Sequence, residues 1–264
     1  MLEDLKNFYK NKKIFITGNT GFKGSWLTMI LNSFNSKLCG YSLNENYKPS
    51  MYELLNLKNK IKLIKGDVRN FQHLNKSINK FKPDIIFHLA AQSLVQKSYS
   101  DPLFTVSTNT GGSANILESC RLSKSLKSLI YITSDKCYEN VEWIWGYREN
   151  DKLGGYDAYS SSKAAAENIF SAYLKSFFKK KKLGAVSVRA GNVIGGGDWA
   201  IDRLIPDCIR SIDKNIPIEI RNPLATRPWQ HVLEPLSGYI NLAIELGNNN
   251  FLHGEAFNFG PKSE

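Results

Sequence analysis

The stretch Thr17-Gly18-Asn19-Thr20-Gly21-Phe22-Lys23-Gly24 predicts the fold of this chain. It follows residues 13–16, a β-branched and aromatic run typical of a buried strand, and it precedes residues 25–31, which have helical spacing. Three glycines at three-residue intervals allow a sharp turn and let a pyrophosphate approach the free amides at a helix start. The spacing alone fits an ordinary strand-to-helix turn equally well, so the rest of the chain must decide.

The composition is that of a globular protein. The chain has 264 residues, of which 42% are hydrophobic, so it can bury a large core in one or two domains. It contains no run of about 18 uncharged apolar residues, and residues 1–6 lack the layout of a signal peptide, so we expect a cytoplasmic location and no membrane partner. The cysteines have no ligand spacing, which predicts reduced thiols and no metal; they are Cys39, Cys120, Cys137 and Cys208.

The net charge of +11 does not by itself indicate nucleic acid. The lysines are spread along the chain, and the one dense cluster, residues 179–182, ends a predicted helix where cations favour the dipole. We therefore expect no nucleic-acid partner. A basic surface also suits a polyanionic small substrate.

Short apolar strands alternate with helices along the chain. Helices are predicted from about residue 71, over 109–119 and over 159–178, and strands over 13–16, 37–42, 61–64, 83–91, 128–133 and 185–189. This alternation predicts an α/β, doubly wound parallel sheet, the Rossmann fold. We expect an NAD-binding domain over residues 1–190 and a small substrate-binding lobe over residues 191–264 that is interleaved with it.

The predicted dinucleotide site has one irregular feature. An acid about 20 residues beyond the glycines usually binds the ribose hydroxyls, but Ser42, Asn44 and Glu45 stand there instead, so the choice of NAD over NADP is an inference. Asp67 could bind the adenine amine or cap the next helix, and His88 is expected to be a packed strand residue. The candidate cofactor contacts are Gly18, Thr20, Gly21, Phe22, Lys23, Gly24, Asp67, Val68, Leu89, Ala90, Ala91, Tyr159 and Lys163.

Tyr159 and Lys163 are four residues apart and so lie on one face of a predicted helix. A phenol has a pKa of about 10, and a neighbouring cation lowers it by favouring the phenolate, which can then act as a base. Ser134, at the end of a predicted strand, could bond the same substrate oxygen. The alternatives are a packed tyrosine with a solvated lysine, and a serine that caps a turn.

Asp135 and Lys136 follow Ser134 directly. Oxidation of an alcohol needs only one base, whereas elimination of water needs a second base and an acid. A neutral lysine amine could remove a proton next to a new ketone while a protonated aspartate supplies one to the departing hydroxyl. The alternative is a salt-bridged turn.

The resemblance to a known family rests on longer strings. They begin with residues 17–26 and continue with Ser134-Asp135-Lys136-Cys137-Tyr138-Glu139-Asn140, residues 145–151 and 154–157, residues 189–199, and Arg227-Pro228-Trp229-Gln230-His231-Val232. With these strings the chain resembles, over essentially its whole length, the CDP-glucose 4,6-dehydratases of the extended short-chain dehydrogenase/reductase superfamily. Lys136 is the distinctive position, because the dehydratases for dTDP-glucose and GDP-mannose typically carry Glu there.

The resemblance implies an NAD-dependent hydro-lyase that converts CDP-glucose to CDP-4-dehydro-6-deoxy-glucose, a precursor of deoxysugars in bacterial surface polysaccharides such as the lipopolysaccharide O-antigen. NAD would be reduced and reoxidised within one turnover. Tyr159, helped by Lys163 and Ser134, would deprotonate the C4 hydroxyl. Lys136 would take the C5 proton and Asp135 would protonate the C6 oxygen.

The resemblance also implies a homodimer, or a dimer of dimers, through the helices near residues 105–120 and 159–178. Family members usually continue well past residues 257–261, so the substrate lobe is expected to be incomplete. Arg227 could grip a diphosphate or simply pack its loop on Trp229. The alternatives to this activity are another sugar-nucleotide 4,6-dehydratase, a 4-epimerase or reductase, and an inactive NAD-binding protein. The candidate substrate contacts are Gln92, Asn192, Arg203, Leu204 and Arg227.

Overall fold

A parallel sheet of seven strands forms the centre of the protein. The structure, a computed structural model, describes residues 2–44, 48–181, 183–248 and 250–261. The strand order is β3-β2-β1-β4-β5-β6-β9, and each neighbouring pair is parallel. This confirms the predicted α/β, doubly wound fold. The strands are β1 (Lys13–Thr17), β2 (Lys37–Ser42), β3 (Lys62–Lys65), β4 (Ile85–His88), β5 (Ser128–Ile132), β6 (Gly184–Ala190) and β9 (Ala256–Phe259).

Both faces of the sheet are covered, so the central strands are buried along their length and mostly apolar. Successive side chains on a strand point to opposite faces. Ile14 and Ile16 therefore enter a core shared with α2 and α10, while Phe15 enters a second core shared with α4, α7 and α8.

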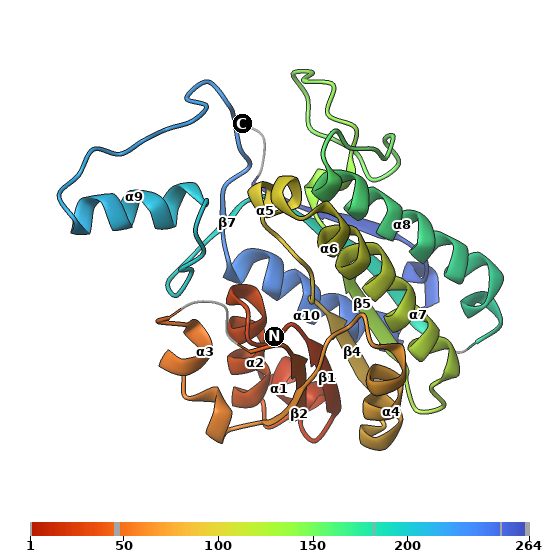
Figure 1. The fold of residues 1–264 in the computed structure, drawn as a ribbon. Coiled ribbons are helices and arrows are strands. Elements are labelled where there is room, and N and C mark those ends of the chain that lie inside the picture. Colours follow the sequence, from red (N-terminus) through yellow and green to blue (C-terminus); the bar gives the residue numbers. More distant parts are fainter. Residues whose placement is uncertain (1, 45–47, 182, 249, 262–264) are drawn as a thin grey trace.

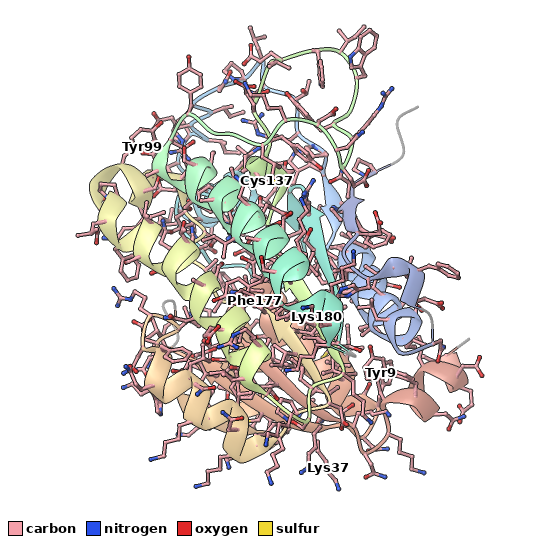
Figure 2. The ribbon with its side chains drawn as sticks, turned by 90° about the vertical axis from the view of Figure 1, so that its right-hand side faces the viewer. Tyr9, Lys37, Tyr99, Cys137, Phe177 and Lys180 are labelled. Carbon is pink, nitrogen blue, oxygen red and sulfur yellow. The ribbon has the colours of Figure 1, made fainter. Side chains whose placement is uncertain are left out.

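The helices lie in two layers (Figure 1). In Figure 2, α7 and α8 run side by side across the face turned toward the viewer. None of the helices in the described ranges is both long and apolar enough to cross a membrane. The main helices are α1 (Leu2–Tyr9), α2 (Phe22–Ser33), α4 (Phe71–Phe81), α6 (Pro102–Val106), α7 (Gly112–Leu122), α8 (Ala158–Ser176) and α10 (Leu233–Asn248).

Several local predictions need correction. The helix predicted over 109–119 is longer, because a π-helical turn at Ser107–Gly111 joins α6 to α7. Asn70, not Asp67, caps α4, with its Oδ1 accepting from the His73 amide at 3.0 Å. The lysine cluster also acts differently from the prediction: Lys181 donates to the last carbonyls of α7, which a cation stabilises. Lys182 lies outside the described residues.

The segment between β6 and α10 leaves the body of the protein. It contains β7 (Val193–Ile194), which pairs with β8 (Gln230–His231), and the helix α9 (Leu204–Asp213) between them. Figure 1 shows α9 standing away from the sheet. The chain then returns to the sheet through α10 and β9, so part of the second predicted domain packs within the first. The division into two domains at residue 190 stays a prediction.

Candidate active site

The three glycines of the turn after β1 have two different roles. Gly18 has a φ of 73°, and a Cβ there would lie 2.7 Å from the Ala90 nitrogen. A Cβ on Gly24 would lie 2.1 Å from the Gly18 carbonyl oxygen. A Cβ on Gly21 would meet only that same oxygen, at 3.4 Å. Gly18 and Gly24 are therefore required by packing within the turn, while Gly21 leaves an open face at the start of α2, where a ligand can approach the backbone.

This turn lies where the strand order reverses, between β1 and β4. Ligands of doubly wound sheets bind in the crevice at such a point, at the carboxyl ends of the strands. Thr17 and His88 end these two strands, and the Thr17 hydroxyl bonds the His88 Nδ1 at 2.8 Å. Burial lowers the pKa of His88 to about 3, so this histidine is neutral and structural, as predicted. Leu89, Ala90 and Ala91 continue from β4 along the crevice.

The predicted adenosine contacts are partly occupied by protein partners. The Asp67 carboxylate accepts from Arg69 through both oxygens, and this hydrogen bonding lowers the pKa of Asp67. The Ser42 hydroxyl donates to the Asn19 side chain at 2.8 Å and so braces the glycine turn. Asn44 is exposed, and Glu45 lies outside the described residues. Val68 is buried against Gly112 of α7.

The helix α8 brings Tyr159 and Lys163 to the same crevice. Asp157 caps the helix by accepting from the Ser160 amide at 2.9 Å, so Tyr159 lies in the first turn and Lys163 one turn later. Both side chains are buried. Burial lowers the pKa of Lys163 to about 8, with Lys23 as the second cause.

Tyr159 corrects one expectation about charge. Burial raises the pKa of its phenol to about 12, although a hydrogen bond with Ser134 opposes the increase. The sequence had predicted a lowered value through Lys163, but the loss of hydration dominates, and the cation that opposes it is Arg203. Added positive charge beside the phenol is therefore needed before it can act as a base near neutral pH.

The turn after β5 supplies three polar side chains in succession. The Ser134 hydroxyl donates to the Asp135 Oδ1 at 3.0 Å, and the Lys136 Nζ lies 3.5 Å from the Asp135 Oδ2. Asp135 also interacts electrostatically with Tyr159 and Lys23. The salt-bridged turn predicted as an alternative does exist, yet Asp135 and Lys136 remain partly exposed and accessible to a ligand.

Charged side chains from two other segments lie near this turn: Arg203 and Asp198 of the lobe, and Lys23 of α2. Arg203 donates to Asp198 at 2.9 Å and to the Ser93 hydroxyl at 3.0 Å. It acts electrostatically on both Tyr159 and Lys23. Burial, followed by Arg203, lowers the pKa of Lys23 to about 8. The lobe thus contributes a cation directly to the crevice.

The other predicted substrate contacts are less directly placed. Gln92 is buried, and its side chain is hydrogen-bonded within the protein. It donates to the Thr105 hydroxyl at 2.9 Å and accepts from the Leu94 amide at 2.6 Å, so it stabilises its own loop instead of reaching a ligand. Asn192 is half-buried beside β8, and Leu204 begins α9. Within the described ranges, the Arg227 guanidinium bonds only to the Thr226 carbonyl, so nothing joins it to the Tyr159 cluster.

Sequence reasoning missed Asp198 and Ser93, which hold Arg203, and Glu167, which lies one turn beyond Lys163 on α8. The four-residue spacing from Lys163 could have identified Glu167. Ser93 carries no comparable signal, because only the fold brings it to Arg203.

Comparison with known proteins gives a consistent result. A family model described as GDP-mannose 4,6 dehydratase matches residues 15–258. A CDP-glucose 4,6-dehydratase from Salmonella typhimurium is 50% identical over 264 residues, which cover 98% of this chain and 74% of that protein. The solved structure of the epimerase Mth375 from Methanothermobacter thermautotrophicus matches with a TM-score of 0.83 and 25% identity, covering 98% of this chain and 75% of that one.

The dTDP-glucose 4,6-dehydratase DesIV from Streptomyces venezuelae, solved with NAD and TYD bound, has the same fold. Its TM-score is 0.79 at 20% identity, over 94% of this chain and 75% of that one. The family match spans most of the chain, and the identity to a named dehydratase is high. The chain therefore belongs to the GDP-mannose 4,6 dehydratase family of nucleotide-sugar enzymes.

Proposed function

We propose that the chain is an NAD-dependent hydro-lyase that converts CDP-glucose to CDP-4-dehydro-6-deoxy-glucose and water. One observation supports this above all: an acid and an amine, Asp135 and Lys136, stand at the sheet edge beside a buried tyrosine and lysine and next to the glycine turn. The name of the 50% identical relative supplies the substrate.

The crevice fits NAD on two counts. Gly21 leaves an open face at the start of α2, and no side chain in the described part of the chain caps that helix. Gly18, Thr20, Gly21, Phe22, Lys23 and Gly24 would surround the pyrophosphate, and Leu89, Ala90 and Ala91 would line the wall beneath the dinucleotide. Bound NAD would supply a hydride acceptor for the sugar C4 and a donor for C6, and its oxidised ring would add positive charge near Tyr159.

The residues of the turn after β5 then have distinct roles. Tyr159 takes the proton of the C4 hydroxyl as the C4–H bond is oxidised. Lys136 takes the C5 proton, which the C4 ketone has made acidic, and Asp135 gives a proton to the C6 oxygen so that it leaves as water. Lys136 then returns its proton to C5. The Ser134 hydroxyl donates to Asp135 and lies close enough to Tyr159 to lower the pKa of its phenol, so it can link the two groups between which a proton must pass before the next cycle.

Arg203 is the best-placed candidate for the diphosphate of the substrate. Its guanidinium reaches the crevice from the lobe and is held by Asp198, and guanidinium groups bind phosphate oxygens through paired hydrogen bonds. Asn192, Leu204 and Arg227 remain proposed contacts for the nucleotide end. A cytoplasmic location is part of the same proposal.

A 4-epimerase is the second candidate, because the epimerase Mth375 matches at 25% identity with the higher of the two TM-scores. An epimerase would need Tyr159 and Lys163 but would leave Asp135 and Lys136 without a chemical task. The two activities give different products, so one assay separates them.

We also propose a homodimer, or a dimer of dimers, through α6, α7 and α8. Leu103 on α6 is 79% exposed, and the same outer surface carries other exposed apolar side chains, namely Tyr99, Val106, Leu122 and Phe177. Sedimentation of the wild type and of a Leu103→Asp variant tests this, because a charge at the interface should convert a dimer to a monomer.

Product analysis tests the activity. The protein with a catalytic amount of NAD is incubated with CDP-glucose, dTDP-glucose and GDP-mannose, and the sugars are identified by NMR. We expect a 4-keto-6-deoxy product from CDP-glucose with no net NADH. A C4 epimer, stoichiometric NADH, or a preference for dTDP- or GDP-sugars would refute the proposal.

A further inference from the structure

A buried ion pair is bonded to the residues on either side of the turn that carries Ser134, Asp135 and Lys136. Arg189 of β6 meets Glu167 of α8 through two hydrogen bonds, of 3.0 Å from its Nε and 2.8 Å from its Nη2. The side chains are only 5% and 3% exposed. Within the described ranges, the other ion pairs all involve more exposed side chains.

Glu167 is fully bonded. One carboxylate oxygen also accepts from the Thr133 hydroxyl, and the other accepts from the Ser187 hydroxyl at 3.0 Å. An ionised carboxylate can be buried only when its oxygens are satisfied in this way. The bond to Thr133 links the ion pair to the turn after β5, because Thr133 immediately precedes Ser134.

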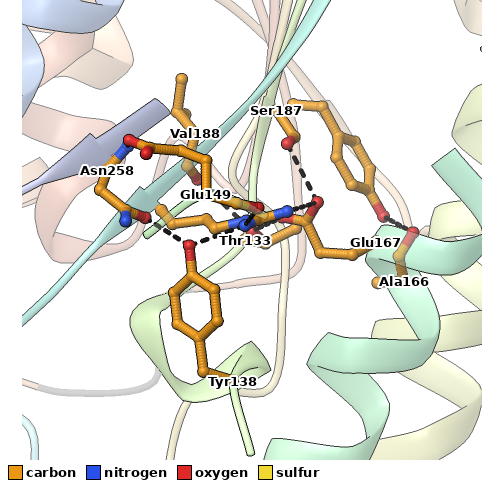
Figure 3. Close-up of polar contacts among 10 residues, drawn as sticks. Thr133, Tyr138, Glu149, Ala166, Glu167, Ser187, Val188 and Asn258 are labelled. Carbon is orange, nitrogen blue, oxygen red and sulfur yellow. Dashed lines mark hydrogen bonds and ion pairs between the residues drawn. The ribbon is translucent and has the colours of Figure 1, made fainter. Parts of the chain in front are cut away.

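Arg189 extends the contacts to the far side of the turn after β5. Its Nη1 donates to the Tyr138 hydroxyl at 2.7 Å and to the Glu149 carbonyl at 2.8 Å. The Tyr138 hydroxyl in turn donates to the Asn258 side chain of β9 at 2.7 Å. Figure 3 shows these side chains as one connected group between α8 and the strands.

The network therefore brackets the active-site turn. Thr133 precedes the segment Ser134–Lys136 and Tyr138 follows it, and both are bonded to the Glu167–Arg189 pair. Glu167 also lies one helical turn beyond Lys163. The same pair thus fixes the turn that carries the acid and the amine, and the helix that carries Tyr159.

Replacing a buried ion pair by apolar side chains is often neutral for stability, so stability alone gives little reason for such a pair. We infer that Glu167 and Arg189 are positioning residues, which hold the turn at Ser134–Lys136 in register with the helix bearing Tyr159 and Lys163 and keep an anion next to the Lys163 ammonium. The catalytic consequence rests on the proposed function, whereas the placement of charge does not.

Lys163 faces groups from each element packed around it. His88 of β4 is neutral, the buried Cys137 thiol has a raised pKa, Lys23 of α2 is a cation that lowers the pKa of Lys163, and the Arg189 guanidinium of β6 lies beyond Glu167, to which it is bonded. Glu167 is the nearby anion, and it opposes the effect of burial on the pKa of Lys163. Neutralising Glu167 should therefore move the pKa of Lys163 further below about 8.

The test compares Glu167→Gln with Glu118→Gln in the NAD-saturated protein. Glu118 makes a similar two-bonded pair with Arg121, at 2.8 and 2.6 Å, but on the surface of α7. The Lys163 titration is followed by NMR of ¹³C-labelled lysine side chains, with Lys163→Met to assign the signal, and turnover of CDP-glucose is measured in parallel.

For Glu167→Gln we expect the Lys163 titration to move down by at least ~0.5 pH unit and kcat to fall about 10- to 100-fold with little change in KM. Glu118→Gln should match the wild type. A wild-type titration and kcat in Glu167→Gln would overturn the inference. If the wild type itself does not turn over CDP-glucose, the proposed function fails while the titration still decides the placement of charge.

A double variant covers the case in which Glu167→Gln does not fold. Glu167→Gln/Arg189→Met leaves no unpaired buried charge, so it should keep a cooperative melting transition. We expect its kcat to remain low and the Lys163 titration to remain shifted. If the double variant has the kcat and the Lys163 titration of the wild type, the two buried charges serve only to neutralise each other, and the inference is overturned.

Discussion

The turn after β1 and the turn after β5 lie at the same edge of one sheet, but main-chain packing shapes the first and polar side chains define the second. The first is made of backbone: Gly18 and Gly24 are required because a Cβ would strike a main-chain atom at 2.7 or 2.1 Å. The second is made of side chains: Ser134, Asp135 and Lys136 each contribute a polar group to the crevice. The first turn can bind a dinucleotide, and the second can transfer protons.

This difference explains why the two turns carry different information about function. A glycine turn of this kind can serve any dinucleotide-binding enzyme of the fold, because its glycines provide only room for the pyrophosphate and free backbone amides. The acid and the amine of the second turn are specific to a reaction, since elimination requires both. Substitutions should therefore separate binding at the first turn from chemistry at the second.

The largest effect is expected from Gly24→Ala. Its new methyl group would overlap the Gly18 carbonyl, and the main chain cannot yield cheaply, so we expect a loss of ~3 kcal/mol in unfolding free energy together with NAD binding. Gly21→Ala is the matched control, because its methyl meets nothing closer than 3.4 Å. It should keep the wild-type melting temperature and weaken NAD binding about tenfold, ~1.4 kcal/mol. Equal effects on stability from both variants would contradict this account of the turn.

Tyr159→Phe comes next in size. Loss of the phenol removes the base of the first chemical step, so kcat should fall by ~10²- to 10⁴-fold while the protein still binds NAD. Tyr173→Phe, on the same helix, removes only a 3.2 Å bond to Glu118 and should behave as the wild type. Turnover and NAD titration measure the two effects, and comparable kcat values for the two variants would exclude Tyr159 as the base.

A smaller effect is expected at alkaline pH. Lys23 is the second cause of the lowered pKa of Lys163, so Lys23→Met should raise that pKa above about 8. Lys163 would then keep its proton to higher pH, and the alkaline fall in kcat should move upward at saturating NAD. An unchanged or lower alkaline limb would show that the two ammonium groups do not interact.

The smallest effect concerns stability. The pKa values of Lys23 and Lys163 are both lowered from 10.5 to about 8, so between these pH values the unfolded chain binds more protons than the folded one. These two lysines therefore contribute stability that rises with pH across this window, whereas the buried cysteines, whose pKa values are raised from 9, contribute stability that falls. Urea unfolding at pH 8 and pH 10 should show the wild type gaining stability relative to Lys23→Met, because the cysteines are the same in both proteins. A difference between the two proteins that does not shift in favour of the wild type over this window would contradict the placement of Lys23.

Much of the fold could be predicted because parallel strands buried on both faces are mostly apolar, as residues 129–132 show. The glycine turn and the spacing of Tyr159 and Lys163 are local, so they too were visible. The helix ends were less accurate: the π-helical turn at Ser107–Gly111 and the cap at Asn70 depend on details that composition does not carry.

The contacts that the sequence could not predict are those made across the fold. Arg203 reaches Ser93 over 110 residues, and Tyr138 reaches Asn258 over 120. Gln92 was predicted to bind substrate, but its amide is used by its own loop and by Thr105. Single residues near a strand end can face either ligand or protein, and only packing decides between them.

The central claim is that the turn after β5 carries out an elimination, and the Lys136→Ala variant tests it most directly. The enzyme, loaded with NAD, is incubated with CDP-glucose in D₂O, and deuterium at C5 is followed by NMR together with absorbance of bound NADH. Lys152→Ala is the control, because Lys152 pairs with Glu139 on the exposed loop beyond the turn. We expect Lys136→Ala to accumulate NADH without exchange at C5, while the control behaves as the wild type. Exchange at C5 that survives in Lys136→Ala would contradict the claim.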